Sequence, residues 1–320
     1  MRLARLLVLL LGLAATLLVA PVATVAFAQE NADFPPLPRP RPDRDATQSN
    51  AGAQSTDATE AIAAVTKVPQ PVTLTARITT DGPAISDGLV WRVFESQPDE
   101  TGEMALVAKA DTGTAEMQLP PGEYNVHVSY GNAQLTETLS VVPGQNQKDM
   151  VIEAGGLRLN SAVTGDIPIS PALLKFDIMT AGPEANRAMV VADLPANQIV
   201  TLNAGTYHIV SRFGSINATV RADLRVEPGE LTEATLYHHA SEVSFKLVSE
   251  EGGEAIADVE WTVKTADGTT VFTERGAFPA TVLAEGEYLV LAKLGDQVYN
   301  REVQIQPGSP REIEVLSTIY

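Results

Sequence analysis

The chain has 320 residues, a length that fits two or three domains. Its hydrophobic content is 44% but its aromatic content only 5%, which indicates several small cores rather than one large one. The formal net charge of −18 repels phosphate backbones and anionic headgroups, so neither nucleic acid nor a membrane surface is expected as a partner. Cysteine is absent, which excludes disulfides, thiolate metal sites, a cysteine nucleophile and a lipoprotein anchor.

Residues 1–28 have the pattern of a secretory signal peptide. Arg2 and Arg5 precede an unbroken apolar run from Leu6 to Ala20, and Ala26-Phe27-Ala28 supplies a small-x-small cleavage pattern. No twin-arginine motif is present, so we expect the general secretory route and a periplasmic or extracellular mature chain that does not insert into a membrane. Retention of the segment as an uncleaved anchor is the alternative, and it exports the remaining residues equally. The mature chain carries 20 basic and 40 acidic side chains, a net charge of −20.

Residues 29–70 are expected to form a disordered linker rich in Pro, Ala and Ser. Prolines alternate with arginines in residues 34–45, FPPLPRPRPDRD, which favours an extended polyproline conformation. Residues 46–66 are mostly Ala, Ser, Thr, Gln and Asp and have little to bury. We interpret the linker as a spacer. The alternative is a docking peptide for a proline-recognition groove.

One pattern occurs three times from Val72 onward. A turn leads into a strand, a glycine follows the turn glycine after nine residues, and a Pro-Gly turn closes the next strand. The turn glycines lie 83 and then 81 residues apart, which is internal repetition. The three turns read Leu119-Pro-Pro-Gly122-Glu-Tyr124, Leu202-Asn-Ala-Gly205-Thr-Tyr207 and Leu283-Ala-Glu-Gly286-Glu-Tyr288.

An upstream strand repeats as well, with apolar and polar residues alternating around one large aromatic residue: Trp91, Phe176 or Trp261. Short alternating strands with a turn signal about every ten residues predict an all-β chain of three tandem immunoglobulin-like or transthyretin-like β-sandwich domains. We place these domains at residues 71–154, 156–240 and 242–320. Short joints are expected at Ala154-Gly155-Gly156 and at Ala240-Ser241.

The repeated aromatic residues have structural interpretations. The Leu-x-x-Gly-x-Tyr sequence matches a tyrosine corner, in which the ring packs in the core and the hydroxyl bonds a nearby backbone group. Tyr124, Tyr207 and Tyr288 are therefore predicted to be structural. The aromatic residue of the upstream strand is predicted to point inward and fill the core.

The Leu-x-x-Gly-x-Tyr strand with its closing Pro-Gly turn resembles the carboxypeptidase-regulatory-like and PEGA-like β-sandwich repeats of bacterial envelope proteins. The resemblance extends over most of residues 71–320, although the tetrapeptide that names the PEGA repeats is absent and no metallopeptidase domain accompanies the repeats. It implies an accessory, adhesive or scaffolding module, and it supplies no catalytic residues to transfer.

The sequence offers no catalytic, metal or cofactor motif, so we expect neither an enzyme nor a cofactor. Asp99-Glu100 and Glu250-Glu251 are interpreted as solvated turn charges rather than a calcium site, because no Asp-x-Asp-x-Asp-Gly loop exists. The four histidines either fall at non-equivalent positions or face opposite sides of one strand; they are His127, His208, His238 and His239.

One strand departs from the alternation. The third repeat reads Tyr288-Leu289-Val290-Leu291-Ala292, which places Leu289 and Leu291 on the face that should meet water. A strand that is apolar on both faces is usually covered on both. We interpret the two leucines as a protein contact. The alternative is that the stems of Lys264 and Arg301 lie across them.

These observations predict an exported, non-enzymatic envelope protein that acts as a binding or scaffolding module with a protein partner. A polysaccharide-binding accessory protein is the alternative. Exposed aromatic residues in loops would favour the alternative, and the loops contain few.

Overall fold

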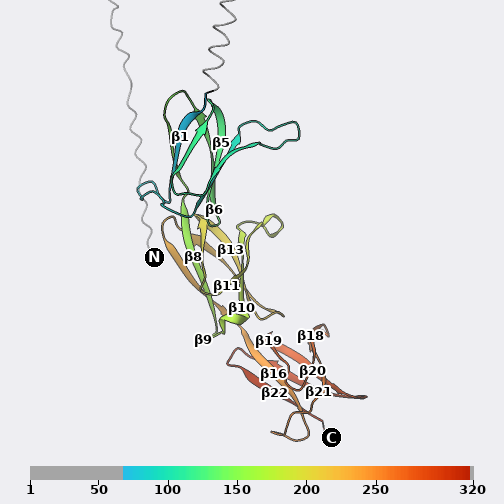
Figure 1. The fold of residues 1–320 in the computed structure, drawn as a ribbon. Helices are drawn as coiled ribbons and strands as arrows, with labels where there is room; N and C mark the ends of the chain where they lie inside the picture. The colour runs from blue at the N-terminus through green and yellow to red at the C-terminus, as the bar shows by residue number, and fades with distance from the viewer. Residues whose placement is uncertain (1–67, 318–320) are drawn as a thin grey trace, which may run out of the picture. The chain divides into compact units, whose positions relative to one another are not determined.

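The computed structural model describes residues 68–317, and within that range the chain contains twenty-two β-strands, two short 3-10 turns and no α-helix. The strands form six sheets, in three consecutive groups along the chain (Figure 1). We call these groups repeat one (β1–β7), repeat two (β8–β15) and repeat three (β16–β22). The expected signal peptide, and the linker up to residue 67, lie outside the described residues.

Repeat one consists of a three-stranded and a four-stranded sheet. The first has the order β4-β1-β7, with β1 at Gln70–Arg77, β4 at Ala115–Leu119 and β7 at Asn146–Val151. The second has the order β3-β2-β5-β6, with β2 at Leu89–Glu95, β3 at Leu106–Ala110, β5 at Gly122–Tyr130 and β6 at Ala133–Val141.

Repeat two has the same plan with small additions. One sheet has the order β12-β8-β15, from β8 (Ala154–Val163), β12 (Ile199–Asn203) and β15 (Leu231–His238), and the short β9 (Ile167–Pro168) also pairs with β8. The other has the order β11-β10-β13-β14, from β10 (Leu174–Thr180), β11 (Met189–Pro195), β13 (Gly205–Phe213) and β14 (Ala218–Val226). The 3-10 turns are η1 (Pro171–Leu173) and η2 (Glu184–Asn186).

Repeat three returns to the plan of repeat one. Its first sheet has the order β19-β16-β22, from β16 (Ala240–Val248), β19 (Ala280–Ala284) and β22 (Arg311–Leu316). Its second has the order β18-β17-β20-β21, from β17 (Glu260–Thr265), β18 (Thr270–Arg275), β20 (Gly286–Leu294) and β21 (Gln297–Ile305). In every repeat the first strand pairs in parallel with the last strand, and the other pairings are antiparallel.

Each repeat contains its own cluster of buried side chains drawn from both of its sheets, as the period-two alternation requires. Trp91, Phe176 and Trp261 are fully buried, which confirms the predicted inward position. The two indole N–H groups donate to backbone carbonyls, Trp91 to Thr112 and Trp261 to Gly276, each at 2.9 Å. A buried aromatic of this size stabilises its repeat by about 3–5 kcal/mol relative to alanine.

The tyrosine corners are present in all three repeats. Each hydroxyl donates to the carbonyl four residues earlier: Tyr124 to Pro120 at 2.8 Å, Tyr207 to Asn203 at 2.9 Å and Tyr288 to Ala284 at 3.0 Å. The rings lie among the core residues of their repeats. The prediction that these tyrosines are structural is therefore confirmed.

The residues expected to form the joints belong to strands. Ala154-Gly155-Gly156 is the start of β8, and Ala240-Ser241 is the start of β16. The connections between the last strand of one repeat and the first strand of the next are only Ile152-Glu153 and His239. The backbone therefore passes from repeat to repeat almost without a linker.

Candidate functional site: the outward face of repeat three

Leu289 and Leu291 lie on the face of β20 opposite to the core. Tyr288, Val290 and Ala292 are buried between the sheets, while the two leucines between them are half-buried. Directly paired residues of antiparallel strands share a face. Leu289 is therefore flanked by Lys264 and Glu302, and Leu291 by Thr262 and Asn300 (pairings of β20 with β17 and β21).

A third apolar side chain belongs to this face. Val298 of β21 pairs with Lys293 of β20 and is 52% exposed. Lys293 follows Leu291 on the same side of the strand, so Val298 lies on the same face as the leucines. We call Leu289, Leu291 and Val298 the β20 apolar face.

A groove of about 470 Å³ borders Leu289. Its walls carry charge, with Lys264 on one side and Glu287 and Glu302 on the other, and the turn after β17 lies at one end. Asp267 holds that turn in shape by accepting hydrogen bonds from the Thr265 hydroxyl and the Thr269 N–H. The same bonds hold the pKa of the Asp267 carboxyl below its ordinary value.

Of the two long side chains named in the alternative, only one lies on the face of the leucines. Lys264 pairs with Leu289 and lines the groove. Arg301 instead pairs with Val290, on the core side, and its guanidinium donates to the Glu314 carbonyl in β22. The alternative, in which both stems lie across the leucines, is therefore wrong for Arg301, because its side chain crosses to the other sheet.

The equivalent positions in the other repeats are polar or mixed. Repeat one has Asn125 and His127 on its outward face. The His127 Nδ1 lies 3.0 Å from the Thr136 hydroxyl. Partial burial lowers the pKa of His127, and the charge of Arg92 lowers it further by a smaller amount. Repeat two has His208, whose Nδ1 lies 2.7 Å from an Asp223 carboxylate oxygen, and Val210. The β20 apolar face is thus specific to repeat three among the three equivalent strands.

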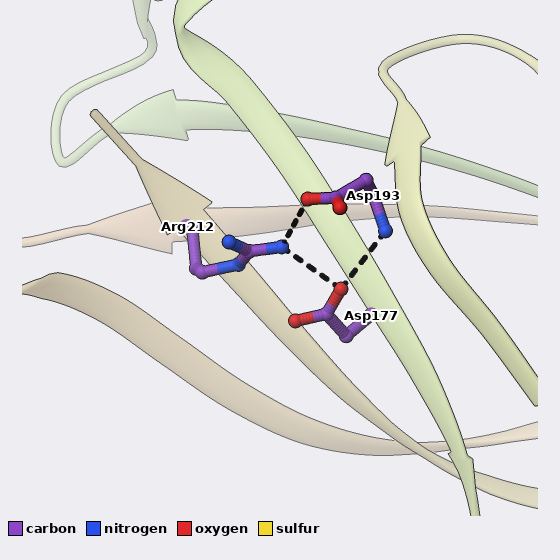
Figure 2. Close-up of polar contacts among 3 residues, drawn as sticks. All are labelled: Asp177, Asp193 and Arg212. Atoms are coloured by element: carbon purple, nitrogen blue, oxygen red, sulfur yellow. Dashed lines mark hydrogen bonds and ion pairs between the residues drawn. The ribbon is translucent and has the colours of Figure 1, made fainter. Parts of the chain in front are cut away.

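Repeat two carries a different cluster on its outward face (Figure 2). Arg212 donates to the carboxylates of Asp177, at 2.9 Å, and Asp193, at 2.6 Å. Asp193 has a positive φ of 54° and its N–H also donates to Asp177. The carboxylate of Asp193, followed by that of Asp177, raises the pKa of the guanidinium. Two carboxylates therefore bind the guanidinium of Arg212 beside a bulge in the pairing of β10 and β11. We interpret this arrangement as structural, because all three charged groups are engaged with one another. This cluster was not predicted from the sequence.

A buried histidine lies in the core of repeat two. His238 is 1% exposed and its Nε2 lies 2.8 Å from the Ser211 hydroxyl, which in turn lies 2.8 Å from the Ser161 hydroxyl. Burial lowers the pKa of His238 to about 4. His239 is 64% exposed, so the two histidines face opposite ways as predicted. The serines are closed off from solvent, and this arrangement cannot act on a substrate.

No metal constellation exists in the range 68–317, where no group of three or more His, Asp or Glu side chains is placed to hold an ion. The Asp99 carboxylate accepts from Thr101 and from the Glu103 N–H, so it closes its own turn. Between residues 68 and 317 the chain contains no helix long and apolar enough to cross a membrane.

The described fold is that of a tandem β-sandwich repeat protein. Residues 242–317 match the sequence profile of the Rhizobiales growth-associated tandem repeat domain, and these residues are those of repeat three. No curated protein matches the chain.

Several solved structures are similar to the chain at low identity. They include the Bacillus anthracis TIE protein (16% identity, 78% of this chain and 50% of that chain, TM-score 0.23), the minor pilin GBS52 of Streptococcus agalactiae (12%, 53% and 95%, 0.33) and the major pilin subunit BcpA of Bacillus cereus (11%, 78% and 100%, 0.22). The chain spans half the length of the B. anthracis protein. Identities and scores this low carry no argument about function.

Proposed function

We propose that this chain is an exported, non-enzymatic protein of the bacterial envelope that binds a protein partner through the β20 apolar face. The signal-peptide pattern of residues 1–28 supports export to the periplasm or beyond. The resemblance to carboxypeptidase-regulatory-like and PEGA-like repeats supports an accessory or scaffolding role.

The observation that carries this proposal is the pair of half-buried leucines at the centre of an outward face. Tandem copies of one fold have Asn125 and His127 at these positions in repeat one, so the fold itself does not require leucine. Covering the part of the two half-buried leucines that is still exposed contributes about 1.5–3 kcal/mol, half of the usual transfer value for two exposed leucines. The freedom lost on association costs more than this, about 4–15 kcal/mol, so the leucines form the centre of a larger contact.

The charges around the β20 apolar face indicate what the partner presents. Glu260, Glu287 and Glu302 outnumber Lys264 and Lys293 on the paired strands, and Lys293 is already engaged with Glu260 at 3.4 Å. A complementary partner carries apolar side chains surrounded by basic residues. Its association rate falls with added salt, because the mature chain is strongly acidic.

Polysaccharide binding is less well supported. Sugar rings stack on exposed aromatic faces, and the large exposed aromatics of the described residues are Tyr237 and Phe278, which lie in different repeats. The Tyr237 hydroxyl is bonded to Asp166. Neither residue belongs to an aromatic platform.

The test is a full-length variant with Leu289→Ser and Leu291→Ser. A matched control carries Leu106→Ser and Leu231→Ser, which replace exposed leucines of repeats one and two. Both proteins are expected to melt within a few degrees of the parent, as surface substitutions usually do. Chemical crosslinking in the native envelope should give a discrete adduct with the parent and with the control. The variant with Leu289→Ser and Leu291→Ser, which we call the β20 variant, should not give this adduct. An adduct retained by the β20 variant would contradict the proposal, and a collapsed melting temperature would show that the leucines serve the fold.

A further inference from the structure

Two hairpin tips of this chain each contact the equivalent strand of the next repeat. The tip between β5 and β6 contacts β12, where the Asn132 N–H donates to the Thr201 carbonyl at 3.1 Å. The tip between β13 and β14 contacts β19, where the Asn217 side chain accepts from the Ala284 N–H at 2.9 Å. β12 and β19 occupy equivalent positions, each paired with the first strand of its repeat. We call them receiving strands.

In the first of these contacts, the receiving strand forms hydrogen bonds with main-chain groups of the tip. The Asn203 side chain accepts from the Gln134 N–H and donates to the Gln134 carbonyl, both at 3.0 Å, and it also donates to the Ile152 carbonyl at 3.1 Å. The tip supplies main-chain groups only. The second tip instead supplies a side chain, that of Asn217, so the two tips do not share one set of hydrogen-bonding groups.

A glycine at each docked tip permits the close approach. Gly131 and Gly214 have φ values of +60° and +70°, which disfavour other residues. A Cβ added at Gly131 would lie 3.0 Å from the Thr201 Cβ, and one at Gly214 would lie 2.7 Å from the Val282 Cβ. The turn and the neighbouring strand thus both require glycine.

The tip of repeat three has the same backbone without a receiving strand. Gly295-Asp296 is a two-residue turn like Gly131-Asn132, and the φ of Gly295 is also +60°. Nothing in residues 68–317 lies within 4 Å of a Cβ added at Gly295. Asp296 and the two residues after it are exposed.

In repeat one the strand equivalent to the receiving strands is β4, and two prolines follow it directly. The two residues that follow the motif leucine are Asn203-Ala204 in repeat two and Ala284-Glu285 in repeat three, but Pro120-Pro121 in repeat one. The Ala204 and Glu285 N–H groups donate to the connecting residues Glu153 and His239. Those two bonds hold the connection and not the tip. The tip is bonded by the Asn203 side chain in repeat two and by the Ala284 N–H in repeat three, and Pro120 offers neither group.

We infer that the β20–β21 tip is a docking surface for a further β-sandwich repeat, one whose receiving strand ends in asparagine or another residue with a free N–H. Pro120-Pro121 keep repeat one of a second copy from filling that role. A head-to-tail contact between identical copies produces open filaments unless its rotation closes a ring, and the prolines disfavour that contact. The surface differs from the β20 apolar face, and the inference does not depend on the proposed function.

Disulfide trapping in the full-length chain tests the inference, because the chain has no cysteine of its own. Asn132→Cys with Thr201→Cys is the positive control and keeps Gly131. The Asn132 N–H bonds the Thr201 carbonyl, so these two cysteines should close within one molecule. The reporter carries cysteine at the equivalent positions, Asp296→Cys and Gln118→Cys, and keeps Gly295. The reporter is compared in two forms. The proline form keeps Pro120 and Pro121, and the opened variant carries Pro120→Asn and Pro121→Ala, so that its β4 is followed by the same two residues as the motif leucine of β12.

The opened variant should form 118–296 links between copies, identified by peptide mass, about tenfold faster than the proline form, as expected for one or two net hydrogen bonds. Equal linkage in both forms would overturn the role of the prolines. No linkage in the opened variant, while the positive control closes, would overturn the docking role of the tip. The reciprocal change, Asn203→Pro with Ala204→Pro in the positive control, should slow its closure, and unchanged closure would also contradict the inference.

Discussion

The side-chain amide of Asn217 in repeat two donates a 2.8 Å hydrogen bond to the hydroxyl of Tyr288 in repeat three. That hydroxyl donates in turn to the Ala284 carbonyl, while the Ala284 N–H donates back to Asn217. The corner tyrosine of repeat three is thus shared between a fold motif and the contact with the preceding repeat. The hydroxyls of Tyr124 and Tyr207 bond only to a carbonyl of their own repeat among the described residues.

Replacing the corner tyrosines by phenylalanine should therefore have unequal effects. Tyr124→Phe and Tyr207→Phe each remove one hydrogen bond, at a cost of about 1 kcal/mol of unfolding free energy. Tyr288→Phe also leaves the Asn217 amide without its acceptor, so we expect about 2–3 kcal/mol. Urea denaturation of the three full-length variants measures the difference. Equal losses would show that the Asn217 bond contributes nothing to stability.

Alanine at the three tip glycines separates backbone strain from contact between repeats. All three glycines have positive φ, so each substitution costs about 1–2 kcal/mol from conformation alone. Gly214→Ala should cost about 2–4 kcal/mol, because its Cβ meets the Cβ of Val282, which cannot move without β19. Gly295→Ala is the matched control with open space around it. Thermal melting that ranks Gly295→Ala as the most damaging change would contradict the docking geometry.

Repeat three should fold alone. Residues 242–320 include both of its sheets, the fully buried Trp261 and the corner tyrosine. Val282 packs with the core of repeat two in the full chain and becomes exposed in the fragment, so some stability is lost. We expect an all-β circular dichroism spectrum and a cooperative melt below that of residues 155–320. A random-coil spectrum would show that the repeats are not independent folding units.

The stability of repeat two should fall between neutral pH and pH 4. Burial holds the pKa of His238 at about 4 in the folded state, below its ordinary value near 6.5. Protonation thus favours the unfolded chain, so stability is complete above pH 6.5 and is lost as the pH falls towards 4, by about 2–3 kcal/mol for this group. Comparing the pH dependence of the parent with that of His238→Phe isolates the effect. The exposed His239→Ala serves as control and should keep the parental slope.

The sequence was sufficient for the features that repeat locally. Alternation around Trp91 and Trp261 predicted their inward side chains, and the Leu-x-x-Gly-x-Tyr spacing predicted the tyrosine hydrogen bonds. Both depend on residues within one strand or turn, where the period of two and the turn chemistry act directly.

The missed features depend on how separate strands meet. The cluster of Arg212 and its two aspartates forms beside a register shift in the pairing of β10 and β11, which no local pattern marks. The tip contacts use asparagine on the receiving strand in one case, Asn203, and on the hairpin in the other, Asn217. One signal was present: the residue after the motif leucine changes from proline to asparagine to alanine while the leucine stays constant.

The most direct test of the proposed protein contact places a photo-crosslinking amino acid at Leu291 of the full-length protein in its native envelope. The same probe at His127, the equivalent position of repeat one, is the control. We predict one discrete protein adduct from position 291, absent at 127, and weakened when Leu289→Ser is added. No adduct from 291, or the same adducts from both positions, would contradict a protein partner at the β20 apolar face.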